Sequence, residues 1–320
     1  MERAGSERVS VASSAEVLRA VSDNVARVVR APDETLRLCV LCLVSEGHLI
    51  IEDFPGVGKT MLAKALSRSI DCSFSRLQFT PDLLPSDVTG VNVFNQRSNE
   101  FEFRPGPVFT NLLLVDEINR ASPKTQAALL ESMQENQVTI DGVTHALPEP
   151  FMVMATQNPI EYEGTYPLPE AQLDRFTMRI AIGYPPLADE ARMLTEQTVE
   201  PPLDSLEPVT AAEEVLAVVE EARRVFVEES LNRYVVALLR HTRSDPRLYL
   251  GASPRSGIAL LRVAKARALL DEREYVEPGD VKAIAEAVLA HRLILAPEAR
   301  AAGLSGADLV REAVEKTPVP

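Results

Sequence analysis

At residues 50–60 the chain reads Ile50-Ile51-Glu52-Asp53-Phe54-Pro55-Gly56-Val57-Gly58-Lys59-Thr60. An apolar run ends at a glycine-containing loop, and strong helix formers follow that loop. This order is typical of a phosphate-binding loop, in which backbone N–H groups and the helix start hold the phosphates. Lys59 would reach the outer phosphates, and the Thr60 hydroxyl would bind Mg²⁺. We therefore predict that nucleotide is bound by Asp53, Phe54, Pro55, Gly56, Val57, Gly58, Lys59, Thr60 and Met61.

One position of this loop departs from the usual pattern. Asp53 stands six residues before the lysine, where the usual motif has glycine. Asp tolerates left-handed backbone angles and can bond to nearby amides, so we expect an intact loop with a modest cost in nucleotide affinity. The alternative is a fortuitous glycine turn before a helix, which the strand–helix context of Gly58-Lys59-Thr60 disfavours.

Two more apolar segments end in polar side chains. Residues 111–115 lead into Asp116 and Glu117, and residues 151–156 lead towards Asn158. Such runs suit strands covered on both faces of a parallel sheet, whose carboxyl edge is where ligands bind. We predict that Asp116 supports Mg²⁺ and that Glu117 polarises the attacking water, the alternative being acids that only cap a turn. Position alone leaves Asn158 open between a phosphate contact and turn chemistry.

Composition narrows the class of protein. The 320 residues are 46% hydrophobic and 25% charged, which is ordinary for a globular chain and leaves room for two domains. The formal charge of −14 weighs against nucleic acid as the main partner. No apolar run approaches the ~20 residues of a membrane span, and the start lacks a signal-peptide pattern, so we expect a cytoplasmic location. Cys39 and Cys42 form a CxxC in an apolar stretch and are interpreted as buried side chains rather than a metal or redox site.

The remaining pattern predicts an α/β part followed by helices. We place a loose tail at residues 1–14, the nucleotide-binding part at residues 15–184 and a helical part with a loose C-terminal end at residues 185–320. Helices are expected at residues 15–29, about 33–45, from Pro123, about 210–227, 231–242, from Pro254, and 278 to about 293. A capping box from Thr210 to Glu213 opens the helix at about 210–227. Further strands are expected at 73–78 and 178–182, and hairpins at 91–103 and 138–144.

Several blocks in this order resemble the MoxR group of AAA+ ATPases over roughly residues 25–295. The blocks are Pro55–Thr60, Asp116–Ala121, Gln126–Glu135, Ala155–Pro159, Leu168–Phe176 and Gly251–Arg255. The resemblance implies an α/β fold, with an AAA+ core built on a five-stranded parallel sheet and an all-helical lid. It also implies ATP and Mg²⁺ as cofactors and a homo-oligomeric ring, expected as a hexamer.

The resemblance assigns roles to further residues. Asn158 resembles the family's first sensor, Arg255 its second sensor on the lid, and Arg175 an arginine finger that reaches a neighbouring subunit's nucleotide. Arg120 is a second candidate for such a contact. From the residues alone, Arg175 could equally pair with a carboxylate of its own subunit, and Arg255 could be a solvated first-turn residue. The two predicted hairpins resemble elements that face the central channel of related rings.

These expectations favour an ATP-hydrolysing, ring-forming remodelling ATPase of chaperone type. Members of the group often act with proteins that carry a von Willebrand factor A domain, in client maturation or metal-cofactor insertion. The alternatives are a nucleotide-dependent binding switch with little hydrolysis, a magnesium-chelatase-like subunit and a nucleic-acid motor. The charge of −14 makes the motor the least favoured of these hypotheses.

Overall fold

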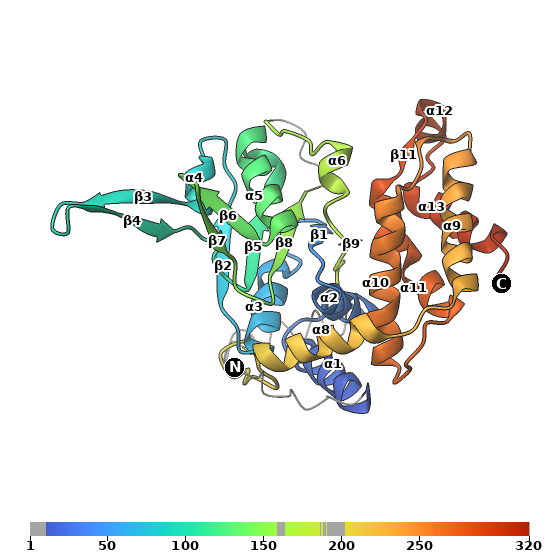
Figure 1. Ribbon diagram of the computed structural model, residues 1–320. Helices are drawn as coiled ribbons and strands as arrows, with labels where there is room; N and C mark the ends of the chain where they lie inside the picture. Colours follow the sequence, from blue (N-terminus) through green and yellow to red (C-terminus); the bar gives the residue numbers. More distant parts are fainter. Residues whose placement is uncertain (1–10, 159–163, 186, 188–189, 191–201, 320) are drawn as a thin grey trace.

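The structure is a computed structural model that describes residues 11–158, 164–185, 187, 190 and 202–319. An α/β part stands beside a helical part, and one long hairpin extends away from both (Figure 1). Within the described residues, no helix is long and apolar enough to cross a membrane.

A sheet of five parallel strands in the order β2-β5-β8-β1-β9 forms the centre of the α/β part. The strands are β1 (Leu49–Glu52), β2 (Phe74–Gln78), β5 (Leu112–Asp116), β8 (Met152–Gln157) and β9 (Met178–Ile180). The predicted five-stranded core is confirmed. This order brings the carboxyl ends of β1, β8 and β5 side by side, because β8 pairs with both β1 and β5.

Side chains alternate between two apolar cores, one on each face of the sheet. In β5, Leu112 and Leu114 join the core that includes α1, α2 and α3, whereas Leu113 and Val115 join the core under α5. Both faces are therefore buried, as the continuous apolar runs of the strands predict. The helices of this part are α1 (Val11–Ala26), α2 (Asp33–Val44), α3 (Lys59–Ser69), α4 (Pro85–Thr89), η1 (Ile118–Arg120), α5 (Pro123–Glu135) and α6 (Glu170–Leu173).

Both expected hairpins are present. They consist of β3 (Gly90–Asn95) with β4 (Glu100–Pro105), and β6 (Gln137–Ile140) with β7 (Val143–Ala146). The second turns at Asp141 and Gly142, both with positive φ, as an Asp-Gly turn requires. The β3–β4 hairpin extends from the sheet (Figure 1) and carries the exposed rings of Phe94 and Phe101, whose centroids lie 5.3 Å apart.

The helical part packs on the N-terminal helices of the α/β part. Both α8 and α10 contact α1 and α2, and one apolar core runs from the sheet into this part. Its elements are α8 (Ala212–Arg224), α9 (Glu229–Ser244), β10 (Leu248–Leu250), α10 (Pro254–Leu270), α11 (Pro278–Leu289), η2 (Ala290–Arg292), β11 (Ile294–Leu295), α12 (Pro297–Ala301) and α13 (Gly306–Lys316). A helical lid is thus confirmed, with one short β10–β11 pair within it.

Several sequence-based details differ from the structure. The last predicted helix was that of residues 278–293, but α13 follows it, because Ser305 caps its start and Leu309, Val310 and Ala313 are buried. The capping contact of α8 uses Glu214 instead of Glu213, since the Glu214 carboxylate accepts from the Thr210 hydroxyl and the Ala211 N–H.

The described residues include only part of the segments at the predicted domain limits. Residues 11–14 of the expected tail belong to α1, where Ser14 packs in the interior, whereas residues 1–10 lie outside the described residues. The start of the helical part predicted at residues 185–320 is only partly described, because residues 186, 188–189 and 191–201 also lie outside the described residues. The boundary between residues 184 and 185 stays a prediction.

Candidate functional site

The loop between β1 and α3 has the backbone shape that phosphate binding needs. Gly56 and Gly58 have φ values of +85° and +95°, a conformation that strongly favours glycine. Gly58 also caps the start of α3, so free backbone N–H groups and the positive helix end face the same space. The Lys59 Nζ donates to the carbonyl of Asp53, which folds the side chain back over the loop. Burial lowers the pKa of Lys59, an effect that the Asp53, Asp116 and Glu117 carboxylates oppose.

Asp53 has a structural part in this loop. It is not among the residues with positive φ, so it does not use its tolerance of left-handed backbone angles, whereas the expected bonds to amides are present. One carboxylate oxygen accepts from the Phe54 N–H at 2.8 Å, and the other accepts from the N–H groups of Ile182 and Gly183 at 2.7 Å each. The carboxylate is buried and ties the loop to the segment after β9.

A cavity of about 420 Å³ lies at the carboxyl edge of the sheet. Five predicted residues from three strand ends meet there: Lys59, Thr60, Asp116, Glu117 and Asn158. Pro55, Gly56, Gly58 and Met61 also line it. Asp53, Phe54 and Val57 do not belong to its lining, and Phe54 instead stacks on Tyr184 with ring centroids 6.0 Å apart.

The two carboxylates at the end of β5 differ in their surroundings. Asp116 is buried, accepts from the Thr156 hydroxyl at 3.3 Å and pairs with Arg76, whose Nε lies 2.6 Å from Asp116 Oδ2. Glu117 adopts left-handed backbone angles, φ 56° and ψ 53°, which is strained for a residue other than glycine. Its N–H donates to Thr156 Oγ1 at 3.0 Å, and its carboxylate lies 2.9 Å from the Arg120 Nε.

Three further residues that line this cavity were not predicted as site residues from the sequence. Arg76 and Gln78 lie on β2, and Thr156 lies on β8. All three lie near the carboxyl ends of strands, and Thr156 also lies in the Ala155–Pro159 block. Which strands are neighbours cannot be read from a local pattern. Thr156 bridges both acids through one hydroxyl, because β8 is the neighbour of β5.

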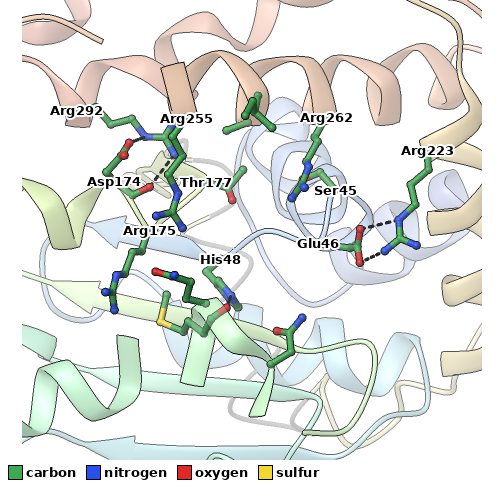
Figure 2. Close-up of a pocket in the computed structure, with 15 residues that line it drawn as sticks. Ser45, Glu46, His48, Asp174, Arg175, Thr177, Arg223, Arg255, Arg262 and Arg292 are labelled. Carbon is green, nitrogen blue, oxygen red and sulfur yellow. Dashed lines mark hydrogen bonds and ion pairs between the residues drawn. The ribbon is translucent and has the colours of Figure 1, made fainter. Parts of the chain in front are cut away.

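Arg175 and Arg255 lie elsewhere. They line a separate cavity of about 470 Å³ at the junction of the α/β and helical parts (Figure 2). Arg223, Arg262 and Arg292 also line it, and Arg223 is paired with Glu46 through its Nε at 2.9 Å. Among the described residues, the side chains of Arg175 and Arg255 have no hydrogen bond or ion pair. The interpretation of Arg175 as the partner of a carboxylate in its own subunit therefore has no support in the described part of the chain.

The donor set of the first cavity suits a magnesium nucleotide. It offers a lysine, a threonine hydroxyl, two carboxylates and a glycine-lined turn. In the described part of the chain, no cluster of three or more His, Cys, Asp or Glu could hold a metal by itself. Mg²⁺ typically binds through one or two protein groups plus phosphates and water, so this sparse set fits it better than a metal enclosed by protein. The Cys39 and Cys42 thiols are free and buried, as expected for core side chains, and burial raises the pKa of Cys39 to about 12.

Comparison with known proteins agrees with this geometry. Residues 48–178 match the family described as "ATPase family associated with various cellular activities (AAA)", and residues 240–313 match the AAA lid domain. The uncharacterized protein YeaC of Bacillus subtilis is 49% identical, with 93% of each chain covered. Chaperone MoxR1 of Mycobacterium tuberculosis is 39% identical, with 97% of this chain and 84% of the relative covered. A crystal structure of a candidate ATPase from Cytophaga hutchinsonii superposes with a TM-score of 0.90 at 38% identity, covering 97% of each chain.

The parallel sheet, the glycine loop at its edge and the helical lid define a nucleotide-binding protein of the AAA+ class. Within that class the similarity extends over nearly the whole chain and includes a protein named MoxR1. The chain belongs to the MoxR family of AAA+ ATPases.

Proposed function

We propose that the protein hydrolyses ATP with Mg²⁺ in a ring of identical subunits and uses the energy to remodel client proteins. The observation that carries the proposal is the meeting of Lys59, Thr60, Asp116, Glu117 and Asn158 around one cavity. Phosphoryl transfer is catalysed mostly by positioning and charge stabilisation, and these residue types supply both.

Each side chain has a distinct part in this scheme. Lys59 binds the outer phosphates, and Thr60 and Asp116 hold Mg²⁺, Asp116 usually through water. When bound, the metal neutralises charge on the phosphates. Glu117 orients and activates the attacking water, and Asn158 contacts the γ-phosphate or that water. Glu117 must leave Arg120 to do so, since the two form an ion pair in this structure.

The positions of Arg175 and Arg255 favour catalysis shared between subunits. Both are outside the cavity of the phosphate loop, and both line a second, arginine-rich cavity of the same chain. In a head-to-tail ring that second surface meets the phosphate cavity of the next copy. An arginine supplied in this way increases the rate by roughly 10³–10⁵, so the isolated subunit should be a poor ATPase.

The client-remodelling part of the proposal rests on family relationship. A close relative is named a chaperone. A hexameric ring, a partner protein with a von Willebrand factor A domain, and a role in client maturation or metal-cofactor insertion are the specific forms that we propose. The exposed β3–β4 hairpin, with Phe94 and Phe101 at its apolar face, would contact the client.

Steady-state phosphate release from Lys59→Ala and Glu117→Gln variants tests hydrolysis at this site. We expect both to fall to background, Lys59→Ala through lost nucleotide binding and Glu117→Gln with binding retained. Lys64→Ala provides a matched control, because Lys64 is an exposed lysine of the same helix. Undiminished release from both variants would refute the assignment.

A nucleotide-dependent binding switch is the second candidate. A free carboxylate near the phosphates at Asp53 would favour it, but that carboxylate accepts from three backbone N–H groups. Tight ATP binding without turnover at any protein concentration would favour the switch, and brisk turnover would eliminate it.

A further inference from the structure

Asp174 is the residue immediately before Arg175, and it lines the cavity of Arg175 and Arg255 and not the phosphate cavity. It lies at the junction of the two parts of the chain, between the end of α6 and the start of β9. One carboxylate oxygen lies 3.3 Å from the Nε of Arg292, which belongs to η2. The Oγ of Ser253 donates to the same carboxylate at 3.3 and 3.5 Å. Three separate segments therefore meet at one side chain.

Arg292 makes this junction rigid. Its side chain is 3% exposed, and its Nη2 donates to the carbonyls of Phe176 at 2.7 Å and Asp174 at 3.4 Å. The neighbouring His291 also bonds to the Phe176 carbonyl through Nε2 at 3.1 Å. Burial lowers the pKa of Arg292 to about 10, and the Asp174 carboxylate opposes that shift. Because a buried cation is costly without a partner, Asp174 and Arg292 depend on each other.

Ser253 connects the same carboxylate to the helix that carries Arg255. Ser253 is the N-cap of α10, where its Oγ also accepts from the Ser256 N–H at 3.2 Å. Arg255 lies in the first turn of that helix, two residues after Ser253. Asp174 is thus adjacent to Arg175 in the chain and bonded to the cap that fixes the start of the Arg255 helix. Figure 2 shows Asp174 beside Arg292, with Arg255 and Arg175 in the same cavity.

We propose that Asp174 is a positioning residue that holds Arg175 and Arg255 at a fixed separation, so that both reach the phosphates bound by a second copy of the chain. This inference rests on the proposed sharing of sites between subunits. Asp174 itself touches neither nucleotide nor metal, since it does not line the phosphate cavity. Its loss would remove the contact that links the segments carrying the two arginines, and a misplacement of about 1 Å costs up to roughly 100-fold in rate.

The test mixes variants that are defective in the phosphate cavity with variants that are defective in the arginine pair of the neighbouring copy. We expect Asp174→Asn to lower kcat about 10- to 100-fold, with KM and the affinity for a fluorescent ADP analogue unchanged, because its own phosphate cavity is intact. Mixed 1:1 with Glu117→Gln it should regain about one quarter of the wild-type rate, since with random pairing about a quarter of all phosphate cavities are intact and also face an intact arginine pair. Mixed with Arg175→Ala it should regain nothing, because both variants are defective on the same side.

Two controls make the result decisive. Glu170→Gln, an exposed carboxylate of the same segment, should behave as the wild type. Ser253→Gly removes the hydroxyl that contacts Asp174, while glycine still caps a helix well. It should regain activity with Glu117→Gln but not with Arg175→Ala, and it tests the inference even if Asp174→Asn fails to fold. Recovery of Arg175→Ala but not of the Asp174 and Ser253 variants by Glu117→Gln would overturn the inference alone. Failure of Arg175→Ala to recover would instead sink the shared-site proposal on which the inference rests.

Discussion

The Nε of Arg76 lies 2.6 Å from Oδ2 of Asp116, so the carboxylate that we assign to Mg²⁺ already faces a positive charge. The metal must compete with this partner. An ion pair of which one member is half exposed is worth up to about 1 kcal/mol. Arg76→Gln should therefore lower the Mg²⁺ concentration for half-maximal phosphate release about two- to fivefold at fixed ATP.

Arg179→Gln is the matched control for Arg76. It breaks an ion pair of similar length, 2.7 Å to Glu52, away from the phosphate cavity. Its magnesium requirement should equal that of the wild type. An unchanged requirement in Arg76→Gln would show that the pair does not compete with the metal.

Thr156 should be needed for turnover more than for binding. Its buried hydroxyl accepts from the Glu117 N–H and donates to Asp116, and it thereby holds both acids in place. Thr156→Val leaves a backbone donor without its acceptor, and we expect phosphate release to fall roughly 10- to 100-fold with nucleotide affinity nearly unchanged. Thr156→Ser retains the hydroxyl and should keep most of the activity. Equal losses in both variants would point to packing instead.

Asp53 should stabilise the loop without opposing nucleotide. Removing its carboxylate leaves three N–H groups without an acceptor, so Asp53→Ala should lower the free energy of unfolding by about 1–3 kcal/mol. Denaturant unfolding measures this loss, and binding of a fluorescent ATP analogue should weaken as well. Tighter ATP binding in Asp53→Ala would restore the view that this carboxylate repels the phosphates. Glu52→Gln changes a carboxylate that pairs with the Arg179 side chain rather than with backbone N–H groups, and it should lower the free energy of unfolding less.

His48 should make the protein less stable in mild acid. Burial lowers its pKa to about 4, while its Nδ1 accepts from the Val153 N–H and its Nε2 bonds to the Met133 carbonyl. The pKa in the unfolded chain is about 6.5, so the unfolded state takes up a proton first as the pH falls. Stability is fully present above pH about 6.5 and declines towards pH 4, by roughly 3 kcal/mol from this group.

A His48→Gln variant should show a flatter decline of unfolding free energy between pH 7 and about pH 4.5 than the wild type. Burial lowers the pKa of His291 too, so the decline should be reduced but not removed. His241→Gln changes a less buried histidine and should leave the slope unchanged. Parallel curves for His48→Gln and the wild type would contradict the assignment.

The sequence predicts the α/β part well because its signals are local. Continuous apolar runs mark β5 and β8, and Asp141-Gly142 marks a hairpin whose positive φ values the structure confirms. Gly56 and Gly58 mark the loop for the same reason, since their backbone angles exclude most other residues. Each of these signals depends on neighbours in the chain and not on the tertiary fold.

What the sequence did not predict depends on strand order and on packing. Arg76 and Thr156 contact Asp116 only because β2 and β8 flank β5; the segment of Arg76 carries no motif, and the Ala155–Pro159 block that contains Thr156 does not indicate its partner. The partners of Asp53 follow from packing too. Bonds to nearby amides could be expected, but its partners at residues 182 and 183 are distant in sequence and could not. The separation of Arg175 and Arg255 from the phosphate cavity likewise follows from how the lid packs.

The central claim is that a phosphate cavity of one subunit is completed by arginines of another. It is tested most directly by phosphate release from Arg175→Ala and Glu117→Gln, each alone and then mixed 1:1 at a protein concentration where the wild-type rate has reached its plateau. We predict background rates for each variant alone and recovery to about one quarter of the wild-type rate in the mixture. A mixture that stays at background would contradict the account.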